Sequence, residues 1–137
     1  MLESKIPADS KVLVVCASGV NRSPTLAWYL ENQGYMNVSY GGVGYRAGEP
    51  RDDGGIGRKV TQTEVDEADW IISVDNQVTA LLRKQYEVGQ KQIVQLNLND
   101  FPTSTFIPGV WNFSNMYPYL KNIENICKDS IGRYLAN

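Results

Sequence analysis

The chain has 137 residues, of which 42% are hydrophobic, a formal net charge of −2 and no histidine. This length suits one domain with its own core, and the small charge gives no reason to expect nucleic acid or an acidic membrane surface as a partner. No apolar run reaches transmembrane length, and the first ten residues lack the apolar centre of a signal peptide. Two cysteines do not make a disulfide framework. We therefore expect one cytoplasmic domain that spans residues 1–137.

The first predicted elements lie between Lys11 and Leu30, in the stretch KVLVVCASGVNRSPTLAWYL. Residues 11–15 are almost all apolar and mostly β-branched, which predicts a buried strand that stops at Cys16. Small and polar residues follow. A helix then begins, with Ser23 at the N-cap and Pro24 in the first helical position, where a missing N–H costs nothing. The pattern predicts a strand, a tight loop and a helix N-terminus.

This loop has the chemistry of an anion site. Its backbone N–H groups and those of the first helical turn can cradle a phosphate-sized anion. Arg22 adds a planar fork that can hold two oxygens of that anion. The same positive field favours the thiolate of Cys16, and Ser23 can donate a hydrogen bond to the sulfur. A thiolate beneath a bound phosphoryl group is arranged for displacement at phosphorus, and because the amides and Arg22 neutralise the charge, we expect neither a metal nor a cofactor.

The spacing Cys-x5-Arg-Ser, between an apolar strand and a helix that starts with proline, resembles the phosphate loop of low-molecular-weight protein tyrosine phosphatases. The resemblance implies that Cys16 is the nucleophile and that the substrate phosphate is bound by Arg22 with Ala17, Ser18, Gly19, Val20, Asn21 and Ser23. The family usually has Asn three residues after the cysteine and often a second cysteine five residues after it, where this chain has Gly19 and Asn21. The second cysteine normally protects the nucleophile from oxidation, and the Asn side chain normally braces the loop.

The rest of the chain alternates between predicted strands and helices. Gln33-Gly34 supplies a stop for the first helix, and Thr61-x-x-Glu64 has the spacing of a capping box. We expect strands near 36–40, 69–75 and 92–96, helices near 61–68, 77–86 and 115–135, and long loops over 41–57 and 97–110. Such alternation predicts an α/β fold with a parallel sheet of about four strands and helices on both faces. The resemblance implies flavodoxin-like strand order, which would put the Cys16 loop at the carboxyl ends of the strands.

A phosphatase of this type also needs a general acid. Because the chain has no histidine, a carboxylic acid is the reasonable choice. The family places an Asp, commonly followed by Pro, in a loop after the fourth strand. Asp100-Phe101-Pro102 is the nearest match and is one residue out of pattern. Asp52 and Asp53 in the Gly-rich loop are the alternatives.

The expected partner is a phosphotyrosine protein or a small aryl phosphate, bound by a monomer. Aromatic side chains in or near the two long loops could stack on a phenyl ring or could fill the core: Tyr45, Phe101, Phe106, Trp111 and Tyr117. Cys127 falls on the apolar stripe of the last predicted helix, so we expect it in the core.

Three other interpretations stay open. An arsenate reductase on the same fold would use the same loop, but it needs further cysteines and Cys127 is the sole candidate. A phosphocysteine carrier of the sugar-transport type would have no need of Arg22. A non-catalytic phosphate- or phosphopeptide-binding module would keep the loop without a working acid, and the imperfect match at Asp100 leaves room for it.

Overall fold

The computed structural model describes residues 5–19, 22–45, 47–49, 58–99 and 117–136. The strands in this part of the chain are β1 (Lys11–Cys16), β2 (Asn37–Gly42), β3 (Trp70–Ser73) and β4 (Gln92–Gln95). The helices are α1 (Arg22–Asn32), α2 (Gln62–Glu67), α3 (Asn76–Gln85), α4 (Tyr117–Ile131) and the 3-10 helix η2 (Gly132–Tyr134). None of the helices in these ranges is long and apolar enough to cross a membrane.

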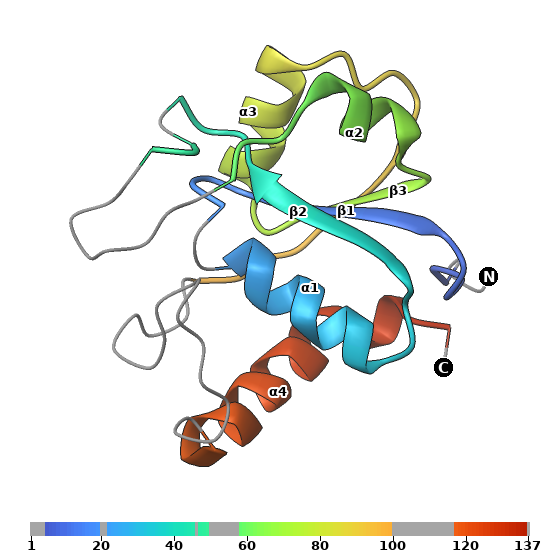
Figure 1. Cartoon of the computed structure of the whole chain (residues 1–137), viewed down its shortest axis with the longest axis vertical. Coiled ribbons are helices and arrows are strands. Elements are labelled where there is room, and N and C mark those ends of the chain that lie inside the picture. The colour runs from blue at the N-terminus through green and yellow to red at the C-terminus, as the bar shows by residue number, and fades with distance from the viewer. Residues whose placement is uncertain (1–4, 20–21, 46, 50–57, 100–116, 137) are drawn as a thin grey trace.

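The four strands form one parallel sheet in the order β2-β1-β3-β4. Helices α1 and α4 cover one face, and α2 and α3 cover the other (Figure 1). The predicted α/β, flavodoxin-like architecture is therefore confirmed. Central strand β1 is buried from Val12 to Cys16, which explains why its sequence is almost wholly apolar. Because all strands run in one direction, β1, β2 and β3 end at the same edge of the sheet.

Helix α1 begins at Arg22, one residue before the predicted N-cap. Ser23 therefore lies inside the first turn and is fully buried, so its prediction as the N-cap is wrong. Pro24 remains in that first turn, where proline is tolerated. The hydroxyl of Ser23 is directed at the sulfur of Cys16 instead of at a backbone N–H.

The predicted stop after α1 is confirmed. Gly34 adopts φ +94°, and its N–H donates to the carbonyl of Glu31 at 3.1 Å. The N–H of Tyr35 reaches back to the carbonyl of Leu30 at 3.1 Å. This pair of bonds is a Schellman motif, which satisfies two carbonyls at the end of the helix.

Two further predictions are confirmed on α2 and α4. Thr61 Oγ1 accepts a hydrogen bond from the Glu64 N–H at 3.2 Å, and Glu64 Oε1 accepts one from the Thr61 N–H at 3.0 Å, which completes the capping box. Cys127 is fully buried in the core. Burial, together with the negative charge of nearby Glu124, raises the pKa of Cys127 to about 12. Cys127 is therefore a side chain of the core.

Candidate active site

Cys16 is the last residue of β1, and its sulfur lies at the base of the loop that leads to α1. The Gly19 N–H donates a hydrogen bond to Sγ at 3.2 Å. The Cys16 thiol donates to the hydroxyl oxygen of Ser23 at 3.1 Å, and the hydroxyl can donate in the opposite direction when the sulfur carries a charge. Cys16 is only 2% exposed, so its side chain is buried at the base of the loop. The backbone N–H and the hydroxyl are both groups that can donate a hydrogen bond to the sulfur.

The loop rests directly on the end of β2. The Val43 N–H donates to the Cys16 carbonyl at 2.9 Å, and the Gly44 N–H donates to the Ala17 carbonyl at 2.8 Å. A Cβ atom on Gly42 would lie only 2.5 Å from the carbonyl carbon of Ser18. Only glycine permits this approach of two backbones. The end of β2 therefore fixes the position of the first half of the loop.

Arg22 points its guanidinium toward the ends of β3 and β4. Its Nη1 donates to Asp75 Oδ2 at 2.8 Å and to the Leu98 carbonyl at 2.8 Å. The two side chains of the ion pair are 11% and 24% exposed, so the pair is largely shielded from solvent. These contacts set the direction of the guanidinium before any substrate is bound.

Asp75 also belongs to this site, although the sequence did not predict it there. Its Oδ1 accepts the Val78 N–H at 2.7 Å and caps α3, while Oδ2 holds Arg22. Burial alone would raise the pKa of Asp75, but the hydrogen bonds from Arg22 and from backbone N–H groups outweigh burial and lower it. The available signal was a carboxylate directly after a buried strand, because parallel strands bring such residues to the edge where Cys16 lies.

Other predicted site residues lie outside the described residues. These are Val20 and Asn21 of the loop, the acid candidates Asp100, Asp52 and Asp53, and the aromatic residues Phe101, Phe106 and Trp111, together with the side chain of Tyr117. Within the described ranges the structure brings Gly19 and Ser23 into contact with the sulfur of Cys16. Ala17 and Ser18 lie against the end of β2, and Arg22 pairs with Asp75.

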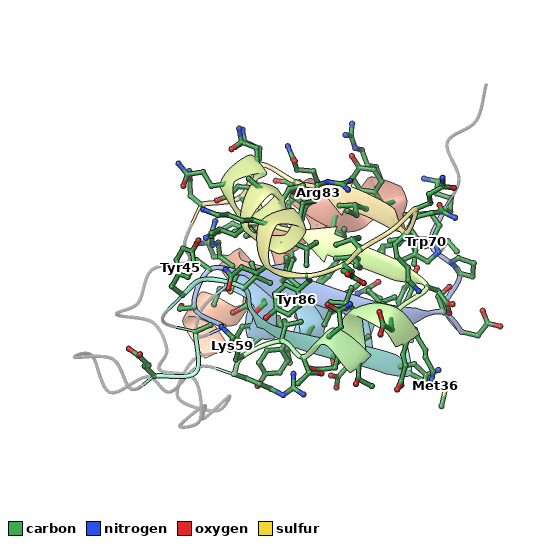
Figure 2. The ribbon with its side chains drawn as sticks, turned by 90° about the horizontal axis from the view of Figure 1, so that it is seen from above. Met36, Tyr45, Lys59, Trp70, Arg83 and Tyr86 are labelled. Carbon is green, nitrogen blue, oxygen red and sulfur yellow. The ribbon has the colours of Figure 1, made fainter. Side chains whose placement is uncertain are left out.

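Tyr45 does not fill the core. It follows Gly44, which is bonded to the loop, and it is 66% exposed, with Lys84 Nζ 5.8 Å from the centroid of its ring. Figure 2 shows Tyr45 and Met36, which are the exposed large hydrophobic residues in the described part of the chain, at opposite ends of the molecule.

A cavity of about 300 Å³ near Met36 is separate from this site. It is lined by Glu67 of α2 and by the first residues of β1 and β2, among them Lys11 and Asn37. Lys11 and Asn37 begin their strands, whereas Cys16 ends one, so the cavity is at the opposite edge of the sheet.

Comparison with known proteins identifies the fold. No protein-family model matches the chain, and no curated protein matches its sequence. Among solved structures, the YwlE arginine phosphatase from Geobacillus stearothermophilus superposes with a TM-score of 0.53 at 14% identity and covers 88% of this chain and 89% of its own. A protein tyrosine phosphatase from Entamoeba histolytica gives 0.51 at 19% identity, with 88% and 94% covered. YfkJ from Bacillus subtilis gives 0.51 at 20% identity, with 92% of each chain covered. At these identities the similarity establishes the fold.

Proposed function

We propose that this chain, whose fold is that of the low-molecular-weight protein tyrosine phosphatases, hydrolyses phosphate monoesters through a phosphocysteine at Cys16. One observation carries the proposal. At the end of β1, the sulfur of Cys16 receives the Gly19 N–H at 3.2 Å and contacts the Ser23 hydroxyl at 3.1 Å, directly before the helix that Arg22 begins. A nucleophile, its stabilising donors and a cation thus follow one another over eight residues of the chain.

In the first step, the Cys16 thiolate attacks phosphorus, the S–P bond forms, and the P–O bond to the leaving group breaks. The loop N–H groups and Arg22 bind the three non-bridging oxygens and stabilise the charge that develops on them. The departing oxygen takes its proton from a carboxylic acid, which we assign to Asp100.

In the second step, water attacks phosphorus, and the carboxylate formed in the first step removes its proton. The S–P bond breaks, and inorganic phosphate is released. The sulfur regains its negative charge as it leaves. Ser23 donates its hydroxyl proton in a hydrogen bond to that sulfur, which makes the thiolate a better leaving group.

Arg22 is oriented for this chemistry before substrate arrives. Nη1 donates both to Asp75 and to the Leu98 carbonyl, and these two contacts hold the guanidinium in one direction. A donor that is already fixed in place costs no reorganisation when the reaction occurs.

The proposed substrate is a phosphotyrosine protein or a small aryl phosphate, acted on by a cytoplasmic monomer with one domain. Tyr45 follows Gly44, whose N–H is bonded to the phosphate loop, and its ring is exposed. Tyr45 is therefore a candidate to stack on the phenyl group of a substrate, as is Phe101.

The test is turnover by purified protein. The wild type should hydrolyse p-nitrophenyl phosphate and a phosphotyrosine peptide, and Cys16→Ser should hydrolyse neither. Cys127→Ala is the matched control, since it removes the other thiol from the core and leaves the loop intact. A phosphoarginine peptide belongs in the same series, because one solved structure of this fold is an arginine phosphatase. A wild-type protein that binds phosphate but turns over none of these substrates would instead be a binding module.

A further inference from the structure

At Gly19 the phosphate loop packs closely against the backbone of Arg58, which is distant in sequence. It adopts φ +76°, and a Cβ atom there would lie 2.5 Å from the Arg58 carbonyl oxygen and 2.7 Å from the Gly42 nitrogen. Real Cβ atoms essentially never approach other heavy atoms below 3.0 Å. The space that a side chain would occupy at this position is therefore filled by the backbone of Arg58 and Gly42.

The Arg58 carbonyl is itself held in place by β2. It accepts the Gly42 N–H at 2.6 Å, and the Val60 N–H returns to the Gly42 carbonyl at 3.0 Å. Gly42 and Lys59 form an isolated parallel bridge, so residues 58–60 extend the sheet beside the end of β2. Gly19 therefore packs against a short ladder of backbone hydrogen bonds between residues 58–60 and Gly42.

The side chain of Arg58 makes two contacts that hold residues 58–60 beside β2. Nη1 donates to the Tyr40 carbonyl at 2.7 Å, and Nη2 lies 2.7 Å from Glu64 Oε2. Glu64 is in turn fixed by the capping box with Thr61. Burial would raise the pKa of Glu64, but the hydrogen bonds from Arg58 and Thr61 lower it, so the carboxylate is charged at neutral pH.

We propose that Arg58 is a positioning residue for the phosphate loop: held by Tyr40 and Glu64, it fixes the backbone against which Gly19 rests. The connection runs from the N-terminus of α2 through Arg58 to the N–H of Gly19 that contacts the Cys16 sulfur. Backbone contact thus takes the place of the side chain that braces this loop in the family. The effect on turnover rests on the proposed function, whereas the effect on the backbone does not.

Two variants test the proposal, each with a neighbouring control. Glu64→Gln keeps an oxygen for the capping box but removes the charge that faces Arg58. Its control is Glu67→Gln on the same helix, where the carboxylate is 57% exposed and 3.9 Å from Lys11. Arg58→Met removes both side-chain contacts. Its control is Lys59→Met, the next residue, whose side chain is exposed to solvent.

The controls should leave kcat/KM for p-nitrophenyl phosphate unchanged. Arg58→Met should lower kcat/KM by up to about 10²-fold, the scale for a small misplacement of catalytic groups from outside the reacting centre, and Glu64→Gln should lower it by less. The double variant should be no worse than Arg58→Met alone, because both changes act through one contact. Additive losses would contradict the proposed connection.

Amide hydrogen exchange provides a readout that needs no turnover. The Gly42 N–H, which donates to Arg58, should exchange faster in Arg58→Met and at the wild-type rate in Lys59→Met. Wild-type exchange and wild-type kcat/KM in Arg58→Met would overturn the proposal. If wild-type protein turned over no phosphate ester, the proposed function would fail, and faster exchange at Gly42 would still establish the role of Arg58.

Discussion

Replacing Asp75 by asparagine separates the two roles of this side chain. Oδ1 caps α3 through the Val78 N–H, and Oδ2 pairs with Arg22. Asparagine keeps an oxygen for the cap and is a good N-cap residue, but it presents an amide in place of the charged oxygen that faces Arg22. Asp75→Asn therefore removes the ion pair and retains the cap, whereas Asp75→Ala removes both.

The expected loss of stability follows from the exposure of the pair. Exposed pairs contribute up to about 1 kcal/mol, and breaking a fully buried pair costs about 3–5 kcal/mol. Since the two side chains are 11% and 24% exposed, we expect Asp75→Asn to lower the free energy of unfolding by about 1–2 kcal/mol, or roughly 3–7 °C in Tm for a chain of this length. Asp75→Ala should lose about 1 kcal/mol more through the missing cap.

The pH dependence of the stability difference between wild type and Asp75→Asn provides a second test of the ion pair. Because Arg22 lowers the pKa of Asp75 in the folded protein, the ion pair contributes fully above the ordinary aspartate pKa of about 3.9 and is lost as pH falls through the lower folded value. The difference in stability between wild type and Asp75→Asn should therefore be constant near neutrality and shrink below about pH 4.

Thermal and urea unfolding of both variants, measured against pH, provide the assay. The same samples should lose kcat/KM, because Arg22 is no longer directed by a fixed partner. Equal stability of Asp75→Asn and wild type at pH 7, or a difference that grows on acidification, would refute this reasoning.

The remaining predictions concern the residues of the proposed chemistry. Arg22→Lys keeps the charge but loses the planar fork, so it should cost about 2–4 kcal/mol of transition-state stabilisation in kcat/KM, and near-native activity would show that Arg22 does not touch the phosphoryl group. Iodoacetate should label Cys16 near neutral pH, with the reaction slowed by added phosphate, while Cys127, whose pKa is raised to about 12, should stay unlabelled in folded protein; equal labelling of the two thiols would contradict this. Asp100→Asn should reduce phosphotyrosine hydrolysis by roughly 10²–10⁴-fold, and hydrolysis of p-nitrophenyl phosphate by less, because p-nitrophenolate needs no proton to leave. Equal losses for the two esters would instead indicate that Asp100 holds its loop in place.

The fold could be predicted because its signals are local. The apolar run before Cys16 reports a strand buried on both faces, and the capping box at Thr61 and the glycine at position 34 mark helix ends within a few residues. The position of Cys16 follows from the same logic, since a parallel sheet collects the ends of its strands at one edge.

The partners of the loop could not be predicted, because they are distant in sequence. Asp75 is 53 residues from Arg22, and neither its charge nor its position after β3 reveals that it pairs with that arginine. The approach of Arg58 to Gly19 is likewise a consequence of how residues 58–60 join β2. The residue type of Ser23 predicts an N-cap, but its hydroxyl contacts the sulfur of Cys16. In each of these cases the partner of the side chain or backbone is set by tertiary contacts and not by the local sequence.

The most direct test of the central claim is to trap the phosphoryl group on the protein. Wild-type protein would be mixed with p-nitrophenyl phosphate, denatured rapidly during turnover and digested, and the modified peptide would be located by mass spectrometry. We expect a phosphoryl group on the peptide that contains Cys16, none on the peptide that contains Cys127, and none on either peptide in Cys16→Ser. A phosphoryl group on a different residue, or undiminished turnover by Cys16→Ser, would contradict it.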